Sequence, residues 1–288
     1  MTRAQILASL GLLFLLGLSL QACTAGVAHG AEPIRLSVTI VRSNPVTTIT
    51  VGDQTVRAII DTGGTVEAAL TLTKEVLDSA GAVDLGTPVV TSDAFGHEVT
   101  TPRFRVPAIT VGGHAFQDLT ALQTPMRADG PPVPNVIGRL FLSHYLVVVD
   151  YAGGSITLWP PNTKNSAGIN CGGARIPMEH TKDDALAVGN FDTQSGRLRL
   201  LWDTGATYSM LPEMVAENLR LVTTVRGPNS PQFYLSKIIS AAGQDFGPLE
   251  FVILPLKLPA DFHGLIGSNF FERHVVCLDY KRREVRVR

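Results

Sequence analysis

An internal repeat constrains the fold of this 288-residue chain more than any other feature of its sequence. The segment Ile60-Asp61-Thr62-Gly63 is echoed by Trp202-Asp203-Thr204-Gly205, and Val136-Ile137-Gly138 is echoed by Leu265-Ile266-Gly267. The spacing agrees too, because the interval from Pro102 to Gly138 equals the interval from Pro231 to Gly267. Equal intervals indicate a tandem duplication, so we expect two lobes of the same fold.

The two copies differ upstream of this matched part. The stretch from Asp61 to Pro102 is clearly longer than the stretch from Asp203 to Pro231, so the second copy is shortened there. The additional length of the first copy includes residues 89–99, whose pattern predicts a strand, a glycine-containing turn and a second strand. A polar stretch with Pro and Gly separates the copies. We therefore predict an N-terminal lobe over residues 31–158, a linker over 159–172 and a C-terminal lobe over 173–288.

Short apolar runs dominate the chain and set its structural class. They are rich in Val, Ile, Thr and Leu and are broken by Gly, Pro and Asn, which is typical of many short strands. Helical patterns are few: residues 71–80, residues 212–221, and a turn or two after Gly138 and after Gly267. The sequence therefore predicts a mainly β protein with two homologous lobes and a few short helices.

The first residues have the pattern of an export signal. Arg3 precedes an apolar run over residues 6–20 that is too short to be read as a spanning helix. The run ends in Leu20-Gln21-Ala22-Cys23, which resembles a bacterial lipobox, although Gln21 is unusual there. We expect a signal peptide over residues 1–22, acylation of Cys23 and an exported protein anchored in the periplasm or cell envelope. The alternative is ordinary cleavage near Gly30, with Cys23 removed.

Charge and cysteine content exclude some partners and leave one question open. The net charge is −1, from 24 basic and 25 acidic residues, which argues against nucleic acid as a partner. The membrane is expected to be reached only through the lipid. Cys171 and Cys277 either form a disulfide, as an oxidising compartment allows, or remain buried thiols. The cysteines and histidines do not have the spacing of a structural zinc site, and we expect neither metal nor cofactor.

The repeated Asp-Thr-Gly motif carries the chemistry. A single copy is weak, because an Asp before a Gly is common in turns. Here each copy follows an apolar strand, and a twofold relation between lobes would bring Asp61 and Asp203 face to face. Two adjacent carboxyls share one proton over a wide pH range, so one can deprotonate a water while the other supports the carbonyl oxygen under attack. Each Thr can join the two loops, and each Gly permits a close approach.

With these motifs, the sequence resembles the aspartic peptidases, and each half resembles a retropepsin-like domain, over about 250 residues. The resemblance implies that Asp61 and Asp203 are catalytic, and that Thr62 and Thr204 form a hydrogen-bonded grip beneath them. It also implies that Gly63, Gly205, Gly138 and Gly267 belong to the loops that support the site, and that a hairpin flap around Phe95 and Gly96 covers bound peptide. Two positions depart from the family pattern: Gly64 follows the first motif, and the flap lacks a tyrosine.

These observations predict an aspartic endopeptidase that acts on extended polypeptide in the bacterial envelope. We expect a monomer whose two lobes form an internal pseudo-dimer. The main alternative is a lipoprotein that binds peptide in the same cleft with little or no turnover. A third interpretation, an unrelated β-rich structural lipoprotein, would have to treat the matched spacings as chance.

Overall fold

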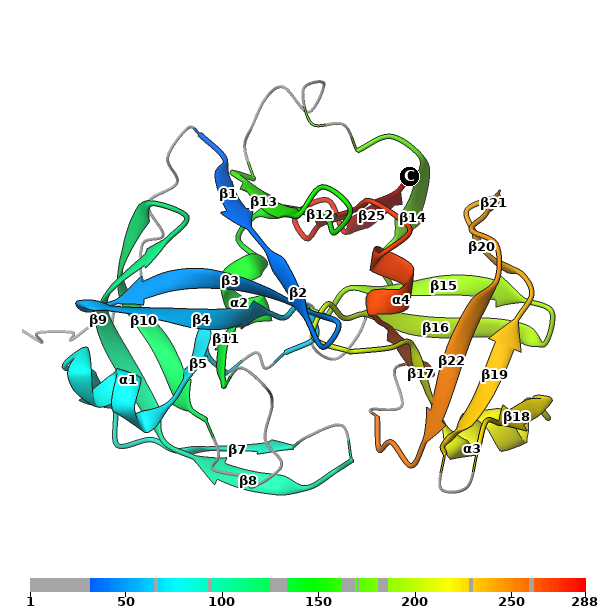
Figure 1. Ribbon diagram of the computed structural model, residues 1–288, viewed down its shortest axis with the longest axis horizontal. Helices are drawn as coiled ribbons and strands as arrows, with labels where there is room; N and C mark the ends of the chain where they lie inside the picture. The colour runs from blue at the N-terminus through cyan, green and yellow to red at the C-terminus, as the bar shows by residue number, and fades with distance from the viewer. Residues whose placement is uncertain are drawn as a thin grey trace, which may run out of the picture.

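The computed structural model describes residues 32–64, 67–92, 95–124, 134–161, 169, 171–180, 186–227, 230–258 and 262–288. The predicted signal peptide and Cys23 lie outside these residues. Two lobes, each built on its own sheet, stand side by side with a third sheet beside both (Figure 1). Strands outnumber helices throughout, which confirms the mainly β class. Within the described residues, no helix is long and apolar enough to cross a bilayer.

The first lobe is an eight-stranded sheet in the order β2-β3-β4-β11-β5-β10-β9-β6. Its strands are β2 (Thr39–Val41), β3 (Asn44–Val51), β4 (Gln54–Ile60), β5 (Leu70–Leu72), β6 (Val83–Asp84), β9 (Arg103–Val111), β10 (His114–Gln123) and β11 (Asn135–Ile137). β3 also pairs with β9 and so curls the sheet on itself. Val106, Ile109 and Val111 of β9 are buried, and the alternation expected of a strand with one dry face is interrupted at Pro107 and Ala108, which are both exposed.

The second lobe repeats this order in a nine-stranded sheet, β18-β19-β22-β17-β23-β16-β15-β20-β21. Its strands are β15 (Val188–Thr193), β16 (Gly196–Trp202), β17 (Met210–Pro212), β18 (Thr223–Val225), β19 (Gln232–Ser236), β20 (Ile239–Ala241), β21 (Gln244–Asp245), β22 (Leu249–Leu254) and β23 (Gly264–Ile266). Read from β15 to β18, they follow the order of β3 to β6 in the first lobe. Trp202, fully buried at the end of β16, packs on Phe191 and Phe270 at ring-centroid distances of 5.3 and 5.5 Å.

A six-stranded sheet joins the lobes in the order β1-β13-β12-β24-β25-β14. Its strands are β1 (Ile34–Ser37), β12 (Leu146–Asp150), β13 (Ser155–Trp159), β14 (Ala174–Pro177), β24 (Val276–Asp279) and β25 (Glu284–Val287). At its centre Val148 pairs with Cys277. The interval between these two residues equals that between Gly138 and Gly267, so each faces its own counterpart in the other repeat. The pseudo-twofold axis therefore passes between β12 and β24.

The helices form where the sequence predicts them, and the two predicted over residues 71–80 and 212–221 are shorter than expected. They are α1 (Lys74–Ser79), α2 (Arg139–Leu142), α3 (Glu213–Asn218) and α4 (Ser268–Phe271). Leu70, Thr71 and Leu72, the last two predicted as helix, form β5 instead, because they pair with both β10 and β11. The Thr73 hydroxyl then accepts a hydrogen bond from Val76 N and caps α1, which fixes the start of the helix.

A disulfide joins Cys171 to Cys277, with 5.9 Å between their Cα atoms. It ties the segment between the lobes to β24, next to the buried side chains of Leu146 and Ile169. Of the two alternatives that the sequence leaves open for these cysteines, the structure has the bridge.

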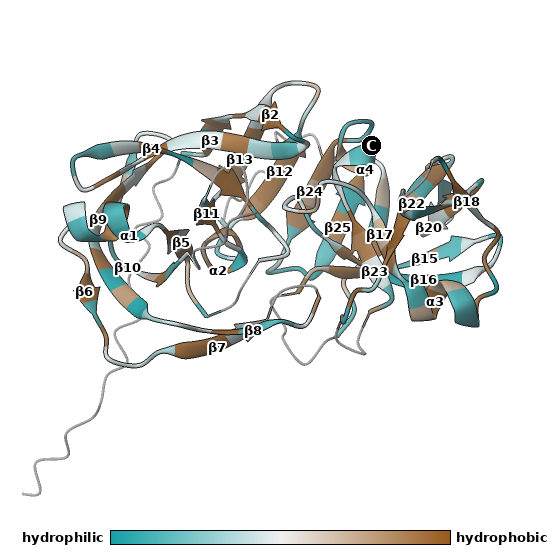
Figure 2. Cartoon of the chain, turned by 60° about the horizontal axis from the view of Figure 1, so that its bottom comes forward, coloured by the Kyte–Doolittle hydropathy of each residue, from teal (hydrophilic) through white to brown (hydrophobic). Residues whose placement is uncertain are grey.

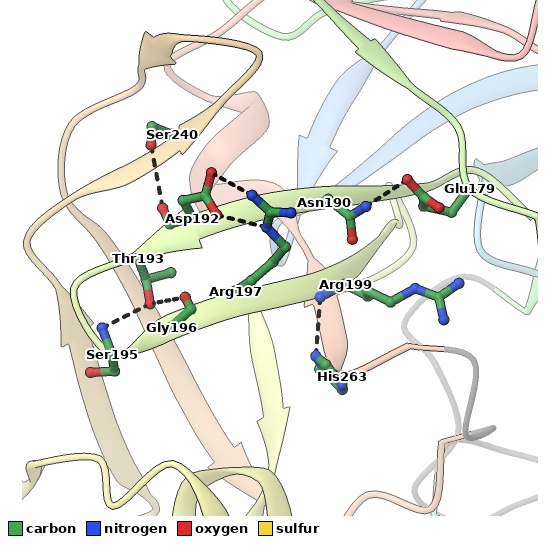
Figure 3. Close-up of polar contacts among 10 residues, drawn as sticks. All are labelled: Glu179, Asn190, Asp192, Thr193, Ser195, Gly196, Arg197, Arg199, Ser240 and His263. Carbon is green, nitrogen blue, oxygen red and sulfur yellow. Dashed lines mark hydrogen bonds and ion pairs between the residues drawn. The ribbon is translucent and has the colours of Figure 1, made fainter.

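The hairpin β15–β16 leads the chain to the second Asp-Thr-Gly motif (Figure 3). Its turn is held by an ion pair between Asp192 and Arg197, 2.8 Å apart, and by a hydrogen bond from the Thr193 hydroxyl to Gly196 O. Asp192 thus has a structural partner on the neighbouring strand, and Arg197 lowers the pKa of its carboxyl.

Candidate active site

The two Asp-Thr-Gly loops occupy equivalent places at the ends of central strands. β4 and β16 run parallel to β11 and β23, respectively. The amide of Asp61 donates to Ile137 O and that of Asp203 donates to Ile266 O, both at 3.0 Å. Each aspartate is therefore fixed at its backbone by the strand that precedes Gly138 or Gly267, and the repeated sequence elements meet in space as pairs.

The two threonines interlock the loops. Thr62 N donates to Thr204 Oγ1 at 3.1 Å, and Thr204 N donates to Thr62 Oγ1 at 3.0 Å. Each hydroxyl in turn donates across the axis, Thr62 to Trp202 O at 2.8 Å and Thr204 to Ile60 O at 2.7 Å. Both side chains are fully buried, and each hydroxyl both donates and accepts. This reciprocal arrangement holds one loop at a fixed distance from the other.

The glycines of the motifs allow the carboxyls to approach the opposite loop. A Cβ atom on Gly63 would lie 2.3 Å from Asp203 Cγ, and one on Gly205 would lie 2.5 Å from Asp61 Cγ. No other residue type fits at such distances. The loop amides also bond to the carboxylates: Gly63 N donates to Asp61 Oδ1 at 2.9 Å, and Gly205 N donates to Asp203 Oδ1 at 2.8 Å.

The environment of the pair favours a retained proton. Asp61 and Asp203 are half-buried, and loss of hydration raises the pKa of both carboxyls. The pKa of Asp203 is raised well above its usual range, first by burial and then by the charge of Asp61. The hydrogen bond from Asp203 opposes this rise in the pKa of Asp61. Because both pKa values are raised and the two carboxyls interact, the pair shares one proton.

Gly138 and Gly267 lie directly behind the two loops. Gly138 N donates to Ala69 O at 2.9 Å, and Gly267 N donates to Ser209 Oγ at 3.0 Å. A Cβ atom on Gly267 would come within 2.3 Å of Tyr208 O, so the second loop can pack this closely only against glycine.

The predicted flap segment forms a hairpin of two short strands, β7 (Val89–Ser92) and β8 (Glu98–Thr101). It runs from the first lobe toward the second (Figures 1 and 2). Phe95 is 41% exposed near its tip. Gly96 has a φ of +79°, and a Cβ atom on it would lie 2.6 Å from Cδ of Lys257 in the second lobe. The hairpin thus bridges the two lobes.

The second lobe has no equivalent hairpin among its described residues, because its chain turns back directly. Asp84 of β6 pairs with Phe104, and Thr224 of β18 pairs with Phe233. Phe104 and Phe233 are counterparts in the repeat, but the chain between the paired residues is much longer in the first lobe. Most of the length missing from the second copy is therefore located between these two pairs.

Three supporting residues escaped the sequence analysis: Asn44, Tyr151 and Ser268. All three bond to carbonyl oxygens of the second loop. Tyr151 has a counterpart in Tyr280, but the side chains of Asn44 and Ser268 have none of their kind in the other repeat. For Asn44 and Ser268, the only signal in the sequence is that these two positions differ between the otherwise matched repeats. Within the described residues, no group of three or more His, Cys, Asp or Glu side chains is placed to hold a metal ion.

Comparison with known proteins agrees with this geometry. Residues 47–141, which include Asp61 and Gly138, match a family model described as aspartyl protease. The fold is similar to the crystal structure of aspartic proteinase from Irpex lacteus, with a TM-score of 0.61 and 12% sequence identity over 89% of this chain and 97% of that chain. No curated protein matches the sequence. The bilobal acid-protease fold expected from the sequence is confirmed.

Proposed function

We propose that this chain, whose first lobe matches the aspartyl protease family and whose fold is that of the aspartic proteinases, is an endopeptidase that hydrolyses peptide bonds between Asp61 and Asp203. The observation that carries the proposal is the pair itself: two carboxyls from symmetry-related loops, locked by Thr62 and Thr204, whose pKa values are both raised. In the proposed reaction Asp61 is taken as the ionised member of the pair and Asp203 as the protonated one, and the reverse assignment gives the same products.

The proposed reaction uses both protonation states. Ionised Asp61 removes a proton from a water molecule, whose oxygen forms a bond to the carbonyl carbon of the substrate. The proton of Asp203 passes to the carbonyl oxygen and gives a neutral tetrahedral diol. In the second step Asp61 gives its proton to the amide nitrogen, the carbon–nitrogen bond breaks, and a diol hydroxyl returns a proton to Asp203. The products are a carboxylic acid and an amine, and the pair regains its starting state.

The substrate of this proposal is an extended polypeptide. It would lie between the lobes and beneath the β7–β8 hairpin, whose tip reaches Lys257 on the far side. A hairpin over the site excludes water and holds the scissile bond near the carboxyls. Because the second lobe turns back at β18–β19, the peptide would meet a flap from one side only.

The direct test replaces each carboxyl in turn. We expect Asp61→Asn and Asp203→Asn each to abolish cleavage of a mixed peptide library between pH 3 and 8, because one shared proton needs both groups. Cleavage sites are read by mass spectrometry, and circular dichroism serves as the folding control. Undiminished cleavage by either purified variant contradicts the assignment. Binding of library peptides by the wild type without any cut would support the peptide-binding alternative instead.

The cellular location is part of the proposal. The lipobox-like residues before Cys23 support a lipid-anchored protein of the bacterial envelope acting on polypeptide there. We expect Cys23→Ser to move the protein from the membrane fraction to the soluble periplasm, with Cys171→Ser as the control that keeps the anchor. A mature N-terminus beyond residue 23, found by mass spectrometry, contradicts lipidation.

A further inference from the structure

A tight turn of the first lobe reaches the active-site loop of the second. β2 and β3 are joined by two residues, Arg42 and Ser43, with φ values of +48° and +67°. Hairpin turns of this kind favour Asn and Gly, because a side chain is strained at positive φ. Asn44, the residue after the turn, lies against the other lobe, where its Nδ2 donates to Gly205 O at 2.7 Å. Strained backbone of this kind is concentrated at functional sites.

The second Asp-Thr-Gly loop is held by hydrogen bonds that three consecutive carbonyl oxygens of the loop accept. Thr204 O accepts from the Tyr151 hydroxyl at 3.4 Å, and Gly205 O accepts from Asn44. Ala206 O accepts from Ser268 N at 3.1 Å. Ser268 Oγ also donates to Ser43 O, so the turn itself is anchored to the second lobe. Two of the three supports, Asn44 and Tyr151, therefore come from the first repeat.

Gly205 connects Asn44 to both carboxyls. Its amide donates to Asp203 Oδ1 at 2.8 Å, its Cα lies against the Asp61 carboxyl, and its carbonyl accepts from Asn44. Any movement of this residue therefore changes the hydrogen bonding of one aspartate and the packing of the other. The Asn44 side chain is buried, with Asn44 only 4% exposed, so solvent offers little replacement for its amide.

The other lobe lacks this support. Val46 pairs with Ile59 and Val188 pairs with Leu201, so these two pairs are counterparts in the repeat. Asn44 precedes Val46 by the same interval as Leu186 precedes Val188, so Asn44 corresponds to Leu186. A leucine side chain cannot donate a hydrogen bond, and Leu186 packs instead in an apolar cluster that includes Val188. The pseudo-twofold symmetry is broken at the position that contacts the active-site loop.

We propose that Asn44 is a positioning residue that holds Gly205 against the two carboxyls and so sets how they divide their proton. This inference rests on the proposed peptidase function for its kinetic consequences. Asn44 contacts neither substrate nor the reacting atoms, and it acts only through Gly205.

The kinetic test uses a peptide that the wild type cleaves, chosen from the mixed library. We expect Asn44→Leu to lower kcat about 100-fold at every pH with little change in KM, because a displaced loop spoils the geometry of the reacting groups. Asn44→Asp should behave differently. At low pH its protonated carboxyl can donate to Gly205 O and restore kcat, whereas the carboxylate formed at higher pH repels that oxygen and raises the pKa of the nearby pair.

A matched control comes from the corresponding strand of the second lobe. Asn190 on β15 donates to Glu179 Oε1 at 2.5 Å (Figure 3), and neither residue belongs to an Asp-Thr-Gly loop. Asn190→Leu and Asn190→Asp make the same chemical changes and should leave kcat and its pH profile as in the wild type. Wild-type kcat and an unchanged profile in both Asn44 variants would overturn the inference.

A second measurement does not depend on turnover. The two carboxyls can be titrated by NMR in protein labelled with ¹³C at the aspartate side chains, in the wild type, Asn44→Leu and Asn190→Leu. We expect the two perturbed titrations to move in Asn44→Leu alone. If the wild type cleaves no peptide but these titrations move, the peptidase proposal fails and the positioning role stands. If it cleaves and they do not move, the positioning role is wrong.

Discussion

At the paired loops, close packing places two carboxyl groups where ionisation is unfavourable. Gly63 and Gly205 let each carboxyl approach the opposite loop, and burial then raises the pKa of both aspartates. A carboxyl whose pKa is higher in the folded than in the unfolded state favours folding when protonated. The stability it contributes is present at low pH and is lost as pH rises through the folded pKa.

This direction of the pH dependence of stability predicts the effect of Asp203→Asn. The neutral amide removes a charge that the fold accommodates poorly at pH 7 and that is absent at pH 3. The free energy of unfolding of the variant should therefore exceed that of the wild type by more at pH 7 than at pH 3. Each unit of pKa difference corresponds to about 1.4 kcal/mol. Urea unfolding at the two pH values measures it.

Asp192→Asn is the control with the opposite sign. Arg197 lowers the pKa of Asp192, so this carboxyl stabilises the fold above its unfolded pKa and loses that contribution in acid. The variant should therefore lose more stability at pH 7 than at pH 3. Equal pH dependence of both variants would contradict the assignment of the raised pKa to the buried pair.

The sequence could predict the residues that are repeated and could not predict those that are unique. Asp61 and Asp203 stand out because each appears in the same motif at the same spacing. Asn44 has no counterpart of its kind, and its contact with Gly205 spans 161 residues of sequence, so nothing local indicates it. Its role depends on how two lobes dock, which is a property of tertiary packing.

Among the structural elements, the β7–β8 hairpin is the one that the two lobes do not share. We expect deletion of residues 94–98 to lower kcat/KM about 10- to 100-fold, because the site loses its cover and the substrate its orientation. The free energy of unfolding should change by less than about 0.5 kcal/mol, since among the described strands β7 and β8 pair only with each other and the tip meets the second lobe at the flexible Lys257 side chain. Peptide cleavage kinetics and urea unfolding measure the two quantities.

The equivalent loop of the second lobe supplies the control for this deletion. The nearest atom that a Cβ on Gly227 would meet is Ser230 Oγ at 3.9 Å, an ordinary contact distance, so Gly227→Ala should leave both activity and stability unchanged. Its neighbour Arg226 is less tolerant, because its guanidinium pairs with Glu250 and lies 4.2 Å above the Phe233 ring. If the deletion left kcat/KM intact, the hairpin would not act as a flap.

Element boundaries show what sequence patterns miss. Period and capping residues located all four helices, but Thr71 and Leu72 were predicted as helix and form a strand, because the neighbouring strands β10 and β11 supply hydrogen bonds that no local pattern reveals. The strand–turn–strand pattern of residues 89–99 corresponds to β7 and β8, since a hairpin is formed by local contacts alone.

In the whole molecule, the disulfide closes a loop of 106 residues between the inter-lobe segment and β24. Replacing both cysteines, Cys171→Ala with Cys277→Ala, should lower the free energy of unfolding by about 4–5 kcal/mol through greater freedom of the unfolded chain. Chemical denaturation measures the loss, and the wild type under reducing conditions should show a similar one. Equal unfolding midpoints for the oxidised wild type and the double variant would contradict this prediction.

The arrangement of the lobes could be anticipated only in part. The duplication predicted a twofold relation, but the six-stranded sheet that joins the halves depends on the pairing of β12 with β24, whose central residues Val148 and Cys277 lie in different repeats. Strand pairing at such distances is fixed by the packing of complete lobes and is invisible to local patterns.

The self-pairing of Val148 with Cys277 has an evolutionary consequence. A sheet whose central strands face their own counterparts is what two separate copies of one half would build as a homodimer. In such a dimer every substitution appears twice, so a single flap or a lone asparagine could not arise. Fusing the copies into one chain removed that constraint. Each half could then mutate by itself, and Asn44 could be selected on one side while its counterpart became Leu186.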